Sequence, residues 1–499
     1  MKKILLALVF MAGMFSANAT QYTDMITVTL NGVIAGASNA TIEVNEQTNG
    51  KQMLLLNNFV LNSPENAMPV GNIAIEATPY EANGNTYLYA NQNINITNGD
   101  ASQAFWLGPN LGSVPVKLLA QLSNGKLYAV IDINFAEMKI KVQFGDGYQI
   151  PNSDFEKFHT VNNNQEPNHW HTFTTSTGAW ASMVNSGKQA TSSSQTRPGT
   201  AGNKSVVISS KSAFLGIVAN GTLTTGRLNA GGMSAASKDN HSYLDISSTD
   251  KDNNGDSFYT LLAGRPDSLV FWTRFKQGTP NNQYPYATAT AVITDGTRYQ
   301  QPEDKAYTNH LAKAENAKIE SKGGIWQRIS IPFQTTNSGV TPKAILVTIS
   351  TNATPGKGSS SDSIWVDDMS LVYNLGVKDI KVKGQSLVGF NANTSSYAYD
   401  KTATLRADDI VVETESKNPV VLKSIDASQA TIIVASNDLM ESKTYTLNLT
   451  TGIRNLATDT NASETAIYNL NGVCVNKVTA KGVYIIKDSK GNTKKVIRK

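Results

Sequence analysis

The stretch Ile364-Trp365-Val366-Asp367-Asp368-Met369-Ser370-Leu371-Val372-Tyr373 reads as one strand of a β-sandwich with two carboxylates inside it. Its apolar residues keep the spacing of a pleated strand if one residue at the acidic pair forms a β-bulge. Far upstream, Asn152-Ser153-Asp154-Phe155-Glu156 shows a similar mixture of acidic and aromatic residues. Burying an unpaired charge costs on the order of several kcal/mol, so a cation or backbone donors must compensate these acids. The two segments therefore predict a sandwich whose first and last strands meet around a hard cation.

The acids of these two segments are candidate ligands for a calcium ion. Calcium takes about 6–8 oxygen ligands and tolerates irregular geometry, so carboxylates supplemented by backbone carbonyls suit it. The alternative is that these carboxylates accept backbone hydrogen bonds or face solvent. The predicted metal ligands are Asp154, Glu156, Asp367 and Asp368.

Residues 150–373 resemble the putative carbohydrate metabolism domain, a jelly-roll family similar to carbohydrate-binding modules. The resemblance rests on blocks that follow one another in the family's order: residues 152–156, 221–227, 265–272 and 365–368 with 372–373. It implies that residues 150–374 form a jelly-roll β-sandwich that binds carbohydrate. In the related modules, calcium at the place of the predicted ligands is structural and lies away from the sugar.

The composition is typical of an exported, multi-domain β protein. At roughly 150 residues per domain, 499 residues predict three or four units. Charged residues make up only 16% of the chain, against a typical ~25%, so Asn, Thr, Ser and Gly must supply the polar surface. The formal net charge of +4 is too small and too dispersed to indicate nucleic-acid binding.

The N-terminus predicts export. Met1-Lys2-Lys3 forms a basic region, residues 4–15 an apolar region, and Ala17-Asn18-Ala19 a cleavage site, which together indicate a signal peptide over residues 1–19. We therefore expect the protein at the cell surface or outer membrane, or outside the cell. No later segment reaches the ~18 apolar residues of a membrane span. Cys474 is the only cysteine, so no internal disulfide is possible.

Residues 20–149 alternate like the strands of an antiparallel barrel. Asn31-Gly32, Asn49-Gly50, Asn83-Gly84 and Asn124-Gly125 stand where tight hairpins need a positive φ. Closing such a sheet would remove its exposed edges. The region resembles the calycin-like β-barrel domain of exported bacterial proteins, in the blocks 58–59, 68–73, 106–109, 114–116 and 131–133.

Glycan recognition needs flat aromatic faces for sugar C–H surfaces and polar side chains for hydroxyls. The carbohydrate-binding candidates, all in turn-rich sequence, are Trp170, Trp180, Tyr284 and Tyr286. The alternative is that these rings seal the ends of the sandwich. In contrast, Trp272, Trp326 and Trp365 fall inside strand-like runs and are expected in the core.

Two further patterns have the character of metal sites. The loop Asp250-Lys251-Asp252-Asn253-Asn254-Gly255-Asp256 copies the first half of an EF-hand loop, but Leu261 occupies the twelfth position, which favours a polar hairpin turn. His169 and His171 would share one strand face as a possible zinc pair, but no third ligand follows at metal spacing.

The C-terminal part predicts two more units. Residues 375–450 alternate like a small sandwich and resemble immunoglobulin-like or cadherin-like modules on bacterial surfaces. Residues 451–499 resemble the C-terminal sorting domain of the type IX secretion pathway, which implies secretion machinery as a partner. The blocks carrying that resemblance are residues 466–473 and 481–487. A terminal hairpin that completes the preceding sandwich is the alternative.

We therefore expect an exported, all-β, multi-domain protein whose jelly roll binds a poly- or oligosaccharide without cleaving it. One alternative is a structural or adhesive surface protein with spacer modules. A second is a glycoside hydrolase, which needs two carboxyl groups about 5–5.5 Å or about 6.5–9.5 Å apart across a cleft. Asp154, Glu156 and Asp367 suit a structural metal better than that pair, and no other catalytic motif is visible.

Overall fold

The computed structural model describes residues 19–62, 67–162, 164–185, 189–213, 216–400, 404–450, 464–475, 477–478, 480–488 and 493–498. The described residues form strands, turns and loops with a few very short helices, which confirms the all-β, multi-domain prediction. The predicted signal peptide lies outside them, apart from residue 19. In the described part of the chain, no helix is long and apolar enough to cross a membrane. The chain divides into two compact units, one comprising residues 1–375 with 416–419 and 436–441, the other the remaining residues.

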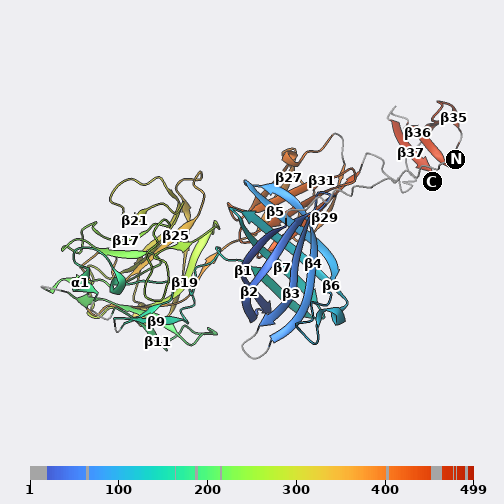
Figure 1. Cartoon of the computed structure of the whole chain (residues 1–499). Helices are drawn as coiled ribbons and strands as arrows, with labels where there is room; N and C mark the ends of the chain where they lie inside the picture. The colour runs from blue at the N-terminus through green and yellow to red at the C-terminus, as the bar shows by residue number, and fades with distance from the viewer. Residues whose placement is uncertain are drawn as a thin grey trace, which may run out of the picture. The chain divides into compact units, whose positions relative to one another are not determined.

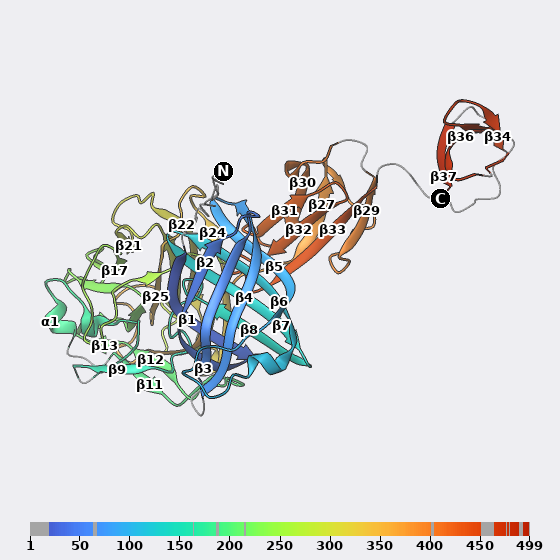
Figure 2. The same cartoon turned by 45° about the vertical axis from the view of Figure 1, so that its right-hand side comes forward.

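The first unit begins with a closed antiparallel barrel in chain order, in which β8 pairs back onto β1. Figure 1 and Figure 2 show these strands in blue to teal. Aliphatic side chains that alternate along the strands fill the interior. The strands are β1 (Thr20–Leu30), β2 (Val33–Glu46), β3 (Gln52–Asn62), β4 (Ala67–Ala82), β5 (Asn85–Asn95), β6 (Ser113–Ser123), β7 (Lys126–Phe135) and β8 (Met138–Phe144), with a 3-10 helix η1 (Gly108–Leu111) before β6.

Three of the four predicted Asn-Gly turns have a positive φ at both residues. The φ values are 49° and 86° at Asn31-Gly32, 51° and 73° at Asn83-Gly84, and 51° and 72° at Asn124-Gly125. Each forms a two-residue loop between paired strands, as expected for a type I′ hairpin. In the fourth turn only Gly50 has a positive φ, of 78°.

Residues 150–374 form two main sheets with smaller sheets around them. The five-stranded sheet has the order β11-β12-β26-β19-β23, and the larger one the order β15-β25-β20-β22-β24 with β18 also pairing β25. The small sheets are β10-β9, β13-β14 and β16-β17-β21. The strands are β9 (Phe158–Val161), β10 (Asn164–Pro167), β11 (Ala190–Ser193), β12 (Ser205–Ser209), β13 (Lys211–Ser212), β14 (Val218–Ala219), β15 (Thr222–Thr224), β16 (Arg227–Ala230), β17 (Asn240–Leu244), β18 (Thr260–Leu261), β19 (Ser268–Lys276), β20 (Ala287–Thr294), β21 (Tyr299–Gln301), β22 (His310–Ile319), β23 (Gln327–Pro332), β24 (Gln334–Thr335), β25 (Ala344–Ser350) and β26 (Ser363–Val372), and the short helices are η2 (Phe173–Thr175), α1 (Ala181–Val184) and η4 (Lys322–Gly324).

The predicted bulge lies in β26 at the acidic pair. Opposite β19, Val270 pairs with Ser370 and Trp272 with Asp367, so two residues of β26 face one residue of β19. Asp368 takes a φ of 40° there. The extra residue lets the consecutive residues Val366 and Asp367 both be buried, although strict alternation would put one of them outside.

The second unit contains the C-terminal sheets. Residues 376–450 form the sheets β28-β27-β30 and β29-β33-β32-β31, and the described residues after 463 form β35-β34-β36-β37. The immunoglobulin-like and sorting-domain assignments stay predictions. The strands are β27 (Val377–Val382), β28 (Gln385–Ser386), β29 (Ser396–Asp400), β30 (Ile410–Thr414), β31 (Val420–Ile425), β32 (Gln429–Ala435), β33 (Ser442–Thr450), β34 (Glu464–Asn469), β35 (Cys474–Val475), β36 (Gly482–Asp488) and β37 (Thr493–Arg498), with η5 (Ala407–Asp409) before β30.

Candidate functional site

The two acidic segments that the sequence singled out meet in the structure. The backbone N–H of Met369 donates to the carbonyl oxygen of Ser153 at 2.8 Å. Asp154 and Asp368 consequently line one shallow recess, together with Trp272. The two segments therefore converge as predicted, but residues 152–156 form a turn followed by irregular backbone and not the predicted strand.

Arg197, which sequence reasoning missed, compensates the acidic pair of β26. Its side-chain Nε donates to Asp368 Oδ2, and its backbone N–H donates to Asp367 Oδ2 at 2.8 Å. The other carboxylate oxygen of Asp367 is buried and has no hydrogen-bond partner among the described residues. Burial, together with the negative charge of Asp368, raises the pKa of Asp367 to about 6. The sequence gives no local signal for this contact, because Arg197 lies 170 residues from Asp367.

Glu156 also has protein partners. Its Oε1 accepts hydrogen bonds from the backbone N–H groups of Asn203 and Lys204, both at 2.9 Å. Backbone donors were the alternative to calcium for these acids, and here they are realised. Among the described residues, no three of the four predicted ligands bring ligand atoms within 4.8 Å of one another. Calcium bound by Asp154, Glu156, Asp367 and Asp368 stays a prediction.

Trp170 is buried, so its prediction as a sugar platform is wrong. Its side chain has no exposed surface, its ring packs 5.2 Å from that of Phe155, and its Nε1–H donates to the carbonyl of Pro151 at 3.2 Å. The turn-rich sequence around it suggested exposure. The turn instead directs the indole inward, where it fills the interior beside the first acidic segment.

The predicted core positions of Trp272, Trp326 and Trp365 are also wrong, because all three are partly exposed. In β19, Phe271 and Phe275 are buried, so Trp272 and Arg274 lie on the opposite face. The guanidinium of Arg274 lies 4.8 Å from the ring centroid of Trp365. The residues just before Trp272 are apolar, so the sequence does not indicate which of them face the core. Arginine side chains cover the tryptophan rings that lie outside the core.

A groove lies over the outward face of the larger sheet. β20 reads Ala-Thr-Ala-Thr-Ala, with its alanines buried, so Thr288 and Thr290 face the groove. Thr348 and Ser350 of β25 continue this hydroxyl-rich floor. The groove has a volume of about 350 Å³, which lies within the usual range for a small-ligand site.

The walls of the groove come from β17, β21 and the loop that leads into α1. Trp180 is partly exposed and lines the groove, and its backbone N–H is fixed by a 2.8 Å hydrogen bond to Ala230 O. Asn240 and Gln301 lie on the walls as well, with the amide of Asn240 donating to Gly232 O at 2.9 Å. The walls therefore combine the rings of Trp180 and Phe173 with aliphatic side chains such as Met183, Ile217 and Met233 and with anchored polar side chains.

Tyr284 and Tyr286 lie next to the groove but are not part of its lining. Both are partly exposed, and their carbonyl oxygens accept hydrogen bonds from the Asn352 amide at 3.1 Å and the Ala353 backbone N–H at 2.8 Å. Of the four predicted sugar-binding aromatics, Trp180 thus remains in the groove. The threonines of its floor were missed, although the Ala-Thr alternation of β20 indicated an outward hydroxyl row.

The barrel corresponds to a known domain family. The family model of the calycin-like beta-barrel domain matches residues 19–146, which spans β1 to β8. This part of the chain is a calycin-like β-barrel domain. In the calycin-like barrel, Leu88, Leu118 and Ala120 have no exposed surface, and the interior is packed with side chains contributed by all eight strands.

Two solved structures are similar to the chain at a low level. A putative glycoside hydrolase from Bacteroides thetaiotaomicron VPI-5482 is 10% identical, with 70% of this chain and 83% of that chain covered and a TM-score of 0.30. The M60 catalytic domain with the CBM51-1 and CBM51-2 domains from Clostridium perfringens ZmpB is 10% identical, with 96% and 43% covered and a TM-score of 0.17. No curated protein matches the chain. Scores this low assign neither a fold nor a function to the region after the barrel.

Proposed function

We propose that the protein binds a neutral oligo- or polysaccharide in the groove beside Trp180 and does not cleave it. The observation that carries the proposal is the composition of the groove, which combines the partly exposed indole of Trp180 and other apolar side chains with a floor of threonine and serine hydroxyls. Sugars present C–H faces that pack on aromatic rings and hydroxyls that exchange hydrogen bonds with such side chains. The described residues of the lining include no lysine or arginine, and burial lowers the pKa of its one histidine, His241, so the groove favours a neutral glycan over an acidic one.

The carboxylates of the groove argue against hydrolysis. Glu315 is the only carboxylate among the described residues that line it. Most glycosidases need two carboxyl groups on either side of the scissile bond. The acids around Asp367 line a different recess and are held by Arg197 and backbone donors. The geometry therefore supports capture of a glycan better than its cleavage.

The cellular setting of the proposed function rests on the sequence. The predicted signal peptide supports export, and the resemblance of residues 451–499 to a sorting domain supports delivery to the cell surface or release by secretion machinery. A calcium ion at the acidic recess would stabilise the fold away from the glycan. The buried, unpartnered Oδ1 of Asp367, whose neighbour Asp368 lines that recess, is the group that such an ion would satisfy.

A glycan array followed by calorimetry tests the proposal on the full mature chain. Trp180→Ala is expected to weaken binding of the best neutral glycan by about 1–2 kcal/mol, or roughly 5- to 30-fold, because the stacking face is lost. Trp326→Ala, which removes a partly exposed tryptophan outside the groove, is the control and is expected to bind normally. Binding to no glycan would favour the structural or adhesive alternative.

A separate assay addresses cleavage. Reducing ends released from the bound glycan are expected to stay at background for the wild-type protein. The proposal would change from binding to hydrolysis if the wild type released reducing ends and Glu315→Gln abolished this release. Glycan binding and melting temperature would have to stay unchanged in that variant.

A further inference from the structure

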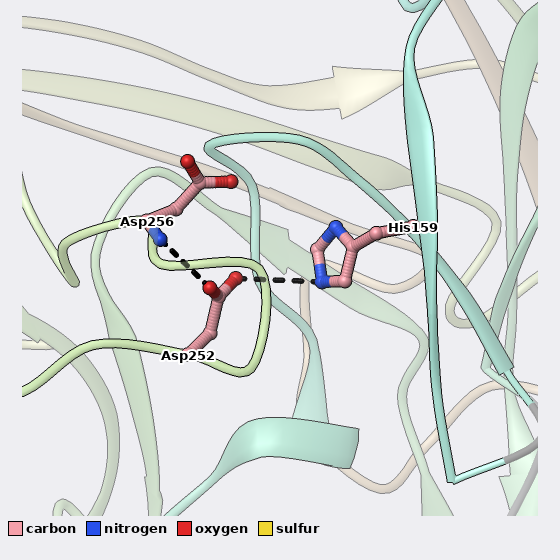
Figure 3. A group of neighbouring side chains, drawn as sticks. All are labelled: His159, Asp252 and Asp256. Carbon is pink, nitrogen blue, oxygen red and sulfur yellow. Dashed lines mark hydrogen bonds and ion pairs between the residues drawn. The ribbon is translucent and has the colours of Figure 1, made fainter.

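Two histidines and two aspartates from distant parts of the chain meet beside the β9–β10 hairpin. Figure 3 shows His159, which projects from β9, facing Asp252 and Asp256 of the loop between β17 and β18. His171, in the segment after β10, approaches Asp252 as well. The Nε2 atom of His159 lies 3.4 Å from Asp252 Oδ2, and the Nδ1 atom of His171 lies 3.7 Å from it. None of these four residues lines the groove beside Trp180.

The three facing atoms are all acceptors. The other ring nitrogen of His171 lies 3.3 Å from the carbonyl oxygen of Ser257, and that of His159 lies 3.2 Å from Asn168 Oδ1. Because both of these partners are oxygen acceptors, each ring carries its proton on that side and directs a lone pair toward Asp252. Asp252 Oδ2 therefore faces two imidazole lone pairs and no donor.

These facing atoms are buried, and the described residues provide no hydrogen-bond donor for them. The side chains of His171 and Asp252 have no exposed surface, and that of His159 is 9% exposed. His159 Nε2, His171 Nδ1 and Asp252 Oδ2 have no hydrogen-bond partner among the described residues. Leaving one such group buried and unsatisfied costs about 1–3 kcal/mol, and more if it is charged, so three together call for a bound cation.

The loop holds its carboxylates in place without using these atoms. Asp252 Oδ1 accepts the backbone N–H groups of Asn254 at 2.9 Å and Asp256 at 2.8 Å, which leaves Oδ2 directed at the imidazoles. Asp256 Oδ2 accepts the backbone N–H of His169 at 2.8 Å. His159, Asp252 and Asp256 offer ligand atoms that all lie within 4.8 Å of one another. Outer hydrogen bonds of this kind orient the ligands of natural metal sites.

The ligand types distinguish between metals. Calcium prefers six to eight oxygens, whereas two imidazole nitrogens with carboxylate oxygens suit zinc and related transition metals. The loop also does not complete an EF-hand, because Asp250 pairs with Arg227 Nη1 at 2.8 Å and is largely exposed. The closed, buried geometry fits a structural ion better than a catalytic one, which keeps an open position.

We propose that His159, Asp252 and Asp256, with His171 Nδ1 against Asp252 as the fourth group, bind one zinc ion that ties the β9–β10 hairpin to the loop of residues 250–256. The third ligand that seemed to be missing for the histidine pair comes from a loop 81 residues after His171 in the chain. Of the two residues first paired, His171 faces the site, while His169 Nδ1 lies 3.1 Å from Asp256 Oδ1 at its edge.

Zinc titration of the untagged, chelator-treated full chain tests the proposal. We expect one zinc per chain by mass spectrometry and a rise in melting temperature of about 5–10 °C at a hundredfold excess over the Kd. Both effects should be lost in His171→Gln and in Asp252→Asn. His310→Gln, which changes a histidine of β22 outside the site, is the matched control and should keep them.

Two results would overturn the zinc site: a wild-type chain that takes up no zinc, or variants that bind it as well as the wild type. An equal melting shift with calcium that persists in His171→Gln would overturn the choice of metal. If neither variant folds, cobalt(II) added to the metal-free wild type decides. The intense visible bands of a four- or five-coordinate cobalt ion support the site, and the weak spectrum of the hydrated ion refutes it.

Discussion

Replacing Asp367 by asparagine should make the protein more stable at neutral pH. The pKa of Asp367 is raised from 3.8 to about 6, mainly by burial, so the folded state binds this proton more tightly than the unfolded chain. The group's contribution to stability is therefore present below about pH 4 and is lost as the pH rises through about 6. A shift of roughly two units corresponds to at most ~3 kcal/mol, and some remaining solvent screening makes about 1–3 kcal/mol the expected change.

Urea denaturation at several pH values between 4 and 8 measures this change. Relative to the wild type, Asp367→Asn should gain stability as the pH rises, with most of the gain between pH 4 and pH 6.5. The hydrogen bond from the Arg197 backbone N–H can persist, because the asparagine carbonyl also accepts. A stability difference that does not vary with pH, or one that turns against asparagine as the pH rises, would refute the reasoning.

The same pair of proteins tests the predicted calcium ion. If calcium binds the unpartnered Oδ1 of Asp367, adding it at pH 7 should raise the melting temperature of the wild type and leave Asp367→Asn unchanged. If calcium does not change the melting temperature of the wild type, Arg197 and the backbone donors alone compensate the charges of these acids.

Two further substitutions test packing and backbone geometry. Trp170→Ala should destabilise the fold by about 3–5 kcal/mol in urea denaturation, because it empties a fully buried site, while glycan affinity of the folded fraction stays unchanged; a stable variant with lost binding would restore Trp170 as a ligand residue. Asn124→Val should cost about 1–2 kcal/mol, because a β-branched residue resists the φ of 51° in this hairpin, whereas Asn124→Gly should be nearly neutral; equal stability of the two variants would contradict the type I′ assignment.

The parts of the fold that depend on local sequence were predictable. The turns at Asn31-Gly32, Asn83-Gly84 and Asn124-Gly125 are set by the positive φ that asparagine and glycine tolerate. The bulge at Asp367-Asp368 followed from a break in the strand period. In each case a few neighbouring residues contain the whole signal.

The parts that depend on distant contacts were not predictable. Trp170 was expected at the surface and is buried, whereas Trp272 was expected in the core and is partly exposed. Exposure depends on which sheet face each strand buries and not on how apolar the surrounding sequence is. Arg197 reaches Asp368 across 171 residues, and Asp252 reaches His171 across 81 residues. Residue spacing within one segment does not indicate which distant residue a side chain will contact. The sequence therefore indicated some residues of each site without the partners that complete it.

A crystal structure of the protein soaked with the best neutral glycan tests the central claim most directly. We expect a sugar ring packed on the indole of Trp180, with its hydroxyls within hydrogen-bonding distance of Thr288, Thr290 or Thr348 on the floor of the groove. Glycan bound instead at the outer face of the five-stranded sheet, over Trp272 and Trp365, would contradict the account.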